Sequence, residues 1–112
     1  MQSKALLFSF TVIASLLIAP CFAAVPQCEA DALAQAKKLL AFHSEGNGQA
    51  AVEPHAKVLP SLVNPANKSQ RFVVLEVVGY VYKTNYRMRF LFYPAGGECV
   101  LMGQEILELS SL

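Results

Sequence analysis

Residues 71–93 read RFVVLEVVGYVYKTNYRMRFLFY, and this stretch decides the fold. Its first half, residues 71–82, is dense in Val, Leu, Phe and Tyr, the residue types that pack well in β-strands. Residues 86–93 alternate between two sets of side chains, as a strand with two different faces does. The polar residues 83–85 between these segments indicate a hairpin loop. We therefore expect two antiparallel strands joined by a short turn.

The chain on either side adds strands to this hairpin. Residues 94–97, Pro-Ala-Gly-Gly, indicate a turn, after which residues 98–109 return as a further strand. Residues 56–63 form another candidate strand, and Pro60 within it belongs at a sheet edge or a bulge because proline cannot donate a ladder hydrogen bond. Residues 64–69 have the composition of a turn or loop. The expected sheet is antiparallel and has three to four strands.

Residues 26–44 have the pattern of an amphipathic helix ahead of the strands. Pro26 suits a first-turn position, and Glu29 and Asp31 interact favourably with the helix dipole at that end. Side chains three and four positions apart form one narrow apolar stripe: Ala32, Leu33, Ala36, Leu39, Leu40 and His43. Residues 45–54, rich in Gly, Asn and Gln, are expected to form a loop. The fold class expected is α+β, with one N-terminal helix packed on a three- to four-stranded antiparallel sheet.

Pairing the strands predicts which side chains share a face. Centring the first hairpin on Thr84 places Tyr80 opposite Met88, on the face that we expect the helix to cover. The same pairing places Arg87 and Arg89 on the other face, which we expect to be partly wet. A register shift of one residue would exchange the two faces.

The second hairpin tests the same pairing. Centring it on Gly96 places Arg87 near Glu105, as a cross-strand ion pair, and places Cys99 on the Arg87 face. A disulfide between Cys99 and the helix would need the opposite face. Either Cys99 lies at a bulge or strand end beside the Gly-Gly turn, or the two faces are assigned the wrong way round.

Residues 1–23 have the organisation of a secretory signal peptide. Residues 1–4 are short and basic, residues 5–19 are almost wholly apolar, and Ala23 closes a small-residue cleavage site with Cys21 at its −3 position. The apolar run of about 15 residues is shorter than the roughly 20 that a membrane-spanning helix needs. The sequence therefore predicts export with cleavage after Ala23.

The expected organisation is a cleaved signal peptide, residues 1–23, and a single α+β domain, residues 24–112, in the periplasm or outside the cell. A lipoprotein signal that leaves an acylated Cys21 at the mature N-terminus is the alternative, with Pro20 a poor fit beside such a cysteine. Lys4 leaves with the signal peptide, so the remaining chain carries no formal net charge. It lacks the basic surface that attracts nucleic acid or an anionic membrane, so we expect neither nucleic-acid binding nor stable membrane insertion.

Cleavage leaves Cys28 and Cys99, an even number of thiols in a compartment that permits disulfides. Their bond would close a loop of about 70 residues and stabilise the domain by about 4 kcal/mol. Two free thiols are the second interpretation. A metal site is disfavoured because these cysteines, with His43 and His55, include no close-spaced ligand pair. We expect a disulfide, no metal and no cofactor.

Residues 72–78, Phe-Val-Val-Leu-Glu-Val-Val, resemble the strand that follows the helix in cystatins, and residues 84–86, Thr-Asn-Tyr, resemble the residues after their first inhibitory loop. With the helix and the meander, this resemblance implies a cystatin-like fold. Cystatins place Gln-x-Val-x-Gly before that Thr-Asn-Tyr, whereas residues 79–83 read GYVYK and match only at Val81. The chain also has no tryptophan for the second-hairpin Pro-Trp motif. The resemblance therefore does not extend to cysteine-protease inhibition.

The residues around the first hairpin form the candidate binding surface, because Tyr and Arg are enriched at protein–protein hot spots. The alternative is that the aromatic side chains form the core of a small sheet. We expect an exported, non-catalytic domain that binds a protein partner, in an inhibitor or immunity-type role among others. The residues expected to contact the partner are Lys83, Tyr86, Arg87, Arg89 and Tyr93.

Two further functions are weighed against binding. A small-ligand carrier would use a cavity between helix and sheet, and a deep apolar pocket would favour it. A hydrolase would need His43 or His55 as a base, with Glu53 as an acidic partner of His55. These histidines also suit a helix end and a surface loop, and no Gly-x-Ser-x-Gly, phosphate-loop or His-Glu-x-x-His motif occurs. We expect no catalytic residue and no enzyme activity.

Overall fold

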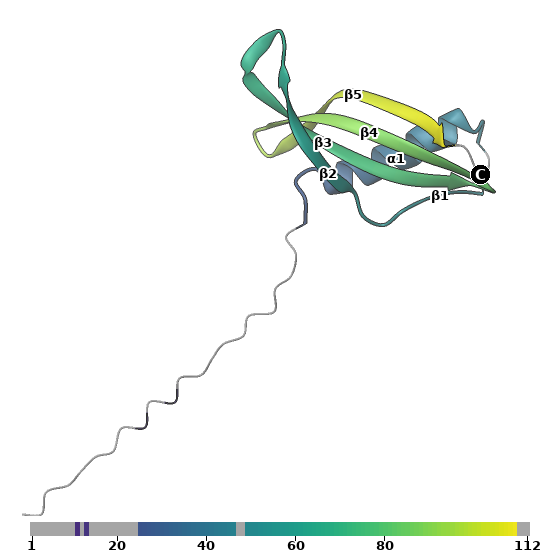
Figure 1. The fold of residues 1–112 in the computed structure, drawn as a ribbon, viewed down its shortest axis with the longest axis horizontal. Coiled ribbons are helices and arrows are strands. Elements are labelled where there is room, and N and C mark those ends of the chain that lie inside the picture. The colour runs from purple at the N-terminus through teal and green to yellow at the C-terminus, as the bar shows by residue number, and fades with distance from the viewer. Residues whose placement is uncertain (1–10, 12, 14–24, 47–48, 110–112) are drawn as a thin grey trace, which may run out of the picture.

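The structure, a computed structural model, describes residues 11, 13, 25–46 and 49–109. Within these residues the chain forms one helix and five strands: α1 (Glu29–His43), β1 (Ala50–Val52), β2 (Lys57–Asn64), β3 (Asn67–Val81), β4 (Thr84–Ala95) and β5 (Glu98–Leu109). The strands pair antiparallel in the order β1–β3–β4–β5, and β2 pairs with the same edge of β3 as β1 does (Figure 1). The predicted α+β class, with the helix ahead of the sheet, is confirmed.

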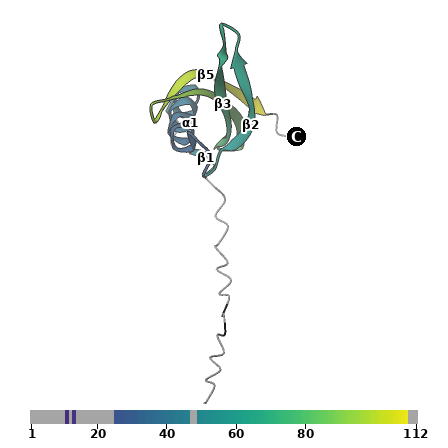
Figure 2. The same ribbon diagram turned by 90° about the vertical axis from the view of Figure 1, so that its left-hand side faces the viewer.

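The helix packs against one face of the curled sheet (Figure 2). The small side chains of Ala32 and Ala36 lie fully buried on that side with Leu40, so the helix approaches the strands closely. The strand residues of this core are Leu75, Val77, Val81, Tyr86, Met88, Phe90 and Phe92. The expected apolar stripe of the helix therefore faces the sheet, and its narrowness follows from the alanines.

The turn between β3 and β4 corrects the register expected for the first hairpin. It consists of Tyr82 and Lys83, with Tyr82 in the left-handed region at φ 55, so Val81 lies opposite Thr84. Met88 consequently faces Val77 rather than Tyr80. The covered face of β4 is the one expected, whereas the prediction for β3 was wrong by one residue. The covered side chains of β3 are the odd-numbered ones from Leu75 to Val81.

The second hairpin turns at Gly96 and Gly97, both at positive φ, and places Cys99 opposite Pro94. Further along, the register shifts by one residue at Met102, so β5 contains a bulge. As a result Arg87 lies opposite Leu107, and the expected Arg87–Glu105 pairing was wrong. The turn also places Cys99 near the strand end on the helix side, which removes the conflict found in the sequence.

A disulfide joins Cys28 to Cys99, with 5.9 Å between their Cα atoms and 71 positions between them in the sequence. Cys28 caps the start of α1 in the left-handed region at φ 69, and Cys99 is the second residue of β5. The predicted disulfide is confirmed. It fastens the helix start to the strand farthest from it in the sequence.

The remaining segments differ from the sequence prediction in detail. The loop expected over residues 45–54 contains the short strand β1, and the turn expected over residues 64–69 narrows to Pro65 and Ala66. Pro60 lies at a register irregularity of the edge strand β2, as its missing N–H requires. The predicted signal peptide lies, except for residues 11 and 13, outside the described residues. No helix in the described part of the chain has the length and apolar character to cross a membrane.

Candidate functional site

The helix covers one face of the sheet, and the opposite face, here called the open face, carries the candidate site. Residues directly opposite each other on antiparallel strands point to the same side. Three cross-strand rows define the open face: Leu59, Val74, Leu91 and Gly103; Lys57, Glu76, Arg89 and Glu105; Val78, Arg87 and Leu107. Each row combines side chains of at least three strands that are far apart in the sequence or joined by turns.

A hollow of about 450 Å³ opens on this face. Its lining is apolar except for one Arg–Glu pair: Leu59, Pro60, Leu62, Val74, Arg89, Leu91 and Glu105. Beside it, Phe72 and Val74 are buried although they point away from the helix-side core, since β3 changes its buried face between Val74 and Leu75. The irregular strand β2 supplies the side chains opposite both residues.

Several large apolar side chains of the open face remain in contact with solvent. Four of them are between 37% and 50% exposed: Leu62, Val100, Leu107 and Leu109. Leu62 lines the hollow, and the other three lie along β5, which is an edge strand of the sheet. Scattered exposed apolar residues are ordinary, but a group on one sheet face marks a surface suited to another apolar surface.

Arg89 is held by two carboxylates of this face. Its Nε donates a hydrogen bond to Glu76 Oε2 at 3.2 Å, and its Nη1 lies 3.7 Å from Glu105 Oε1. Glu76 is on β3 and Glu105 is on β5, so the two ion pairs join β4 to both of its neighbouring strands. Arg89 therefore links three strands.

Arg87, two residues before Arg89 on the same face, has no such partners. It lies half-buried between Val78 and Leu107, and its Nε is shielded from solvent without a hydrogen-bond partner. Among the described residues no carboxylate comes within ion-pair distance of its guanidinium group. An unpartnered buried donor is uncommon and costs about 1–3 kcal/mol.

The residues predicted to contact a partner divide between the two faces. Arg87, Arg89 and Tyr93 lie together on the open face of β4, and Lys83 lies in the β3–β4 turn, with its Nζ 5.6 Å from the ring centroid of Tyr82. Tyr86 points to the helix side, is 8% exposed, and packs edge-on at 5.3 Å from the ring of His43. It belongs to the core.

The sequence prediction missed the apolar part of the site, above all Leu59, Leu62 and Leu107. Leu59 and Leu62 were assigned to an edge strand whose facing side could not be read across Pro60. The expected register placed Leu107 on the Arg87 face, as the structure does, but Leu107 was not assigned to the site.

The residues considered for catalysis have other partners. Tyr80 donates a 2.5 Å hydrogen bond to Glu53, and this bond, with burial and the carboxylate charge, raises the pKa of Tyr80 above its usual value of 10. His55 Nδ1 lies 3.5 Å from Glu29, whose other oxygen accepts the Ala56 N–H at 3.2 Å. The Glu53–His55 pair is thus replaced by two contacts that anchor the loop before β2. Among the described residues no cluster of His, Cys, Asp and Glu could hold a metal ion.

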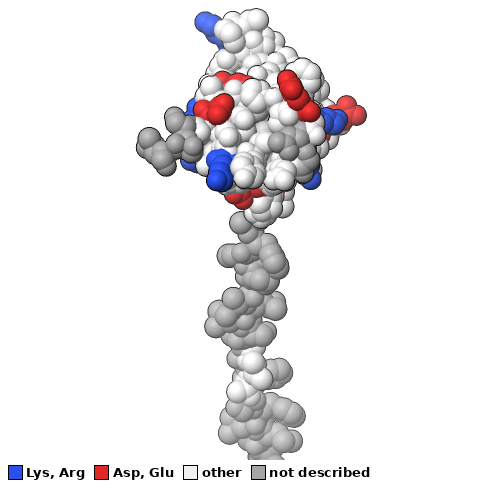
Figure 3. All heavy atoms as spheres, turned by 90° about the vertical axis from the view of Figure 1, so that its right-hand side faces the viewer, with Lys and Arg blue, Asp and Glu red and all other residues white. Residues whose placement is uncertain are grey.

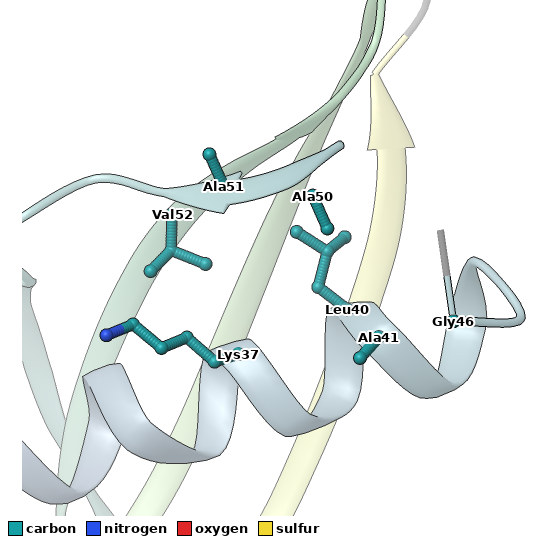
Figure 4. Close-up of a pocket in the computed structure, with 7 residues that line it drawn as sticks. All are labelled: Lys37, Leu40, Ala41, Gly46, Ala50, Ala51 and Val52. Atoms are coloured by element: carbon teal, nitrogen blue, oxygen red, sulfur yellow. The ribbon is translucent and has the colours of Figure 1, made fainter. Parts of the chain in front are cut away.

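A second cavity, of about 380 Å³, lies between α1 and β1 (Figure 4). Its lining is Lys37, Leu40, Ala41, Gly46, Ala50, Ala51 and Val52. In Figure 4 the aliphatic part of Lys37 extends along the opening toward Val52, which leaves one charged group at an otherwise apolar rim. Its size is within the range of small-ligand pockets.

The charged side chains visible at the end of the domain where β5 finishes are interspersed by sign, with uncharged surface between them (Figure 3). Comparison of the chain with protein-family models, curated proteins and solved structures finds no match.

Proposed function

We propose that the protein is an exported, non-catalytic binding domain that recognises a protein partner in the periplasm or extracellular space through the open face of its sheet. The observation that carries the proposal is the group of solvent-exposed apolar side chains around the hollow, with arginines beside them. Such a surface is suited to a protein interface, where apolar anchors fill pockets and Arg and Tyr contribute strongly. An inhibitor or immunity-type role belongs to this class, because it requires only that a partner surface be covered.

Two observations favour export and so support the proposal. The pattern of residues 1–23 predicts a signal peptide, and the Cys28–Cys99 bond is of the kind that persists in oxidising compartments. The cystatin-like resemblance is consistent with a small helix-and-sheet binder. The cystatin inhibitory-loop sequence is absent at residues 79–83. The proposed contact surface is therefore the open face of the sheet and not that loop.

Affinity capture with matched variants tests the proposal. The oxidised protein is used to capture proteins from an extract of its source, and the captured proteins are quantified by mass spectrometry. Leu107→Glu changes the open face, and Phe42→Glu, at an 85% exposed position of α1, is the control. We expect Leu107→Glu to lose the partner and Phe42→Glu to retain it. Loss in the control with retention in Leu107→Glu contradicts the proposal.

A small-ligand carrier is the alternative, and the cavity between α1 and β1 favours it. A carrier would co-purify with an apolar molecule that native mass spectrometry detects as added mass. Ala41→Phe, at the lining of that cavity, would remove the added mass without altering partner capture. Protein that carries no added mass, and gains none from an apolar ligand mixture, would rule the carrier out.

A further inference from the structure

The two arginines of the open face differ in a way that specifies a ligand. Arg89 has two carboxylates within ion-pair distance, at 3.2 and 3.7 Å. Arg87 has none among the described residues, and its Nε is both buried and unbonded. Its cross-strand neighbours are Val78 and Leu107, which offer no acceptor side chain. The free protein therefore holds one half-buried cation without an ion-pair partner among the described residues.

Such a cation favours a particular partner group. A guanidinium group binds a carboxylate through two parallel hydrogen bonds, and these bonds are stronger where neighbouring side chains exclude water. The half-buried Arg87 lies opposite Leu107, and the apolar hollow opens one row further along the same face. A ligand with one carboxylate next to apolar side chains would satisfy both features.

We propose that Arg87 is the anchor for a single Asp or Glu carboxylate of the protein partner, whose adjacent apolar side chains enter the hollow lined by Leu59, Leu62 and Leu91. This inference rests on the proposed function and names the chemistry of the partner. The local charges select one carboxylate: Glu76 and Glu105 pair with Arg89 in the row next to Arg87 and would repel a multiply charged phosphate. Lys57, opposite Glu76, is exposed and lies outside the row of Arg87. The ligand is an acidic-apolar protein segment.

Peptide selection followed by a double-mutant cycle tests the inference. A random 12-residue peptide library displayed on phage is selected on the oxidised protein, and the best peptides are synthesised. We expect enrichment of one Asp or Glu flanked by Leu, Val, Ile or Phe. For each peptide, affinity is measured with its acid or the matching amide, against the unaltered protein and Arg87→Gln. Either change should weaken binding at least tenfold, and both together should weaken it no further, since they break the same ion pair.

Three controls make the outcome decisive. Lys38→Gln, which removes an exposed cation of α1, should leave the acid-to-amide ratio unchanged, because α1 packs on the other face of the sheet. Arg87→Glu should bind a peptide in which Lys replaces the acid, and Arg87→Gln should unfold at the same temperature as the unaltered protein. The inference is wrong if the two changes together reduce affinity by the product of their separate factors. It is also wrong if the selected peptides show no enriched Asp or Glu. If the inference on Arg87 fails but Leu107→Glu still abolishes peptide binding, the proposed function stands. If Leu107→Glu binds normally, the proposed function fails as well.

Discussion

Gly79 shows how closely the helix and the sheet approach at the level of single atoms. A Cβ at this position would lie 2.8 Å from Leu40 Cδ2 and 2.9 Å from Met88 Cε. Both side chains are fully buried, so neither can move into solvent. Leu40 and Met88 therefore fill the space that a side chain at position 79 would occupy, so core packing requires glycine in the middle of β3.

Gly79→Ala should destabilise the protein by about 1–3 kcal/mol, because overpacking a filled core costs that much. Chemical denaturation measures the change in the free energy of unfolding. Combining it with Leu40→Ala should cost less than the sum of the two single changes, since the smaller side chain makes room for the new methyl group. Additive losses would contradict the contact that the structure shows between these positions.

Tyr80 carries a pH prediction. Its hydrogen bond to Glu53 raises its pKa, so the folded state favours the neutral phenol. The resulting stability is fully present below pH of about 10 and declines above it, because the unfolded chain then ionises Tyr80 before the folded one does. Tyrosinate absorbance during alkaline titration should contain a late component that Tyr80→Phe removes and Glu53→Ala shifts to lower pH. An unchanged titration in Tyr80→Phe would refute the assignment.

At the level of elements, the helix and the long strands follow from sequence because each has a strong periodic pattern. The faces of β3 do not, because the β3–β4 turn places Tyr82 in the left-handed region, and a tyrosine gives no signal for that conformation. The bulge at Met102 likewise has no sequence signal, and it places Glu105 opposite Arg89. The arginines of the site could be predicted from sequence, whereas Leu59 and Leu62 could not, because their pairing with β3 depends on the register irregularity at Pro60.

Arg89 connects three strands, so its removal should lower the stability of the fold. Arg89→Gln should lower the free energy of unfolding by about 1 kcal/mol, since it leaves the mostly buried Glu76 carboxylate without its charged donor. Arg87→Gln should change it little, because no ion pair is lost among the described residues. Equilibrium denaturation of both variants measures the difference. Equal losses in the two variants would be inconsistent with the pairing.

At the scale of the whole molecule, the disulfide joins the two layers at one end. Replacing Cys28 and Cys99 by alanine, or reducing the bond, should lower the free energy of unfolding by about 2–5 kcal/mol. The expected loss is large for a domain with a single small core. Denaturation with and without reductant gives the value. A reduced protein as stable as the oxidised one would show that packing of α1 suffices by itself.

The molecule as a whole has one face that its own helix covers and one that keeps apolar side chains and an unpaired arginine in reach of solvent. This difference is the basis of the proposed function, because α1 packs on one face, whereas the hollow and Arg87 lie on the other. The proposed function therefore predicts that a partner contacts the open face.

Methyl NMR of the isotope-labelled protein, titrated with the tightest selected peptide, distinguishes the two faces. We expect shifts of the methyl signals of Leu62, Leu91 and Leu107 on the open face, with the helix methyls of Leu33 and Leu39 unchanged. Shifts confined to the helix methyls, with a silent open face, would contradict the proposed function.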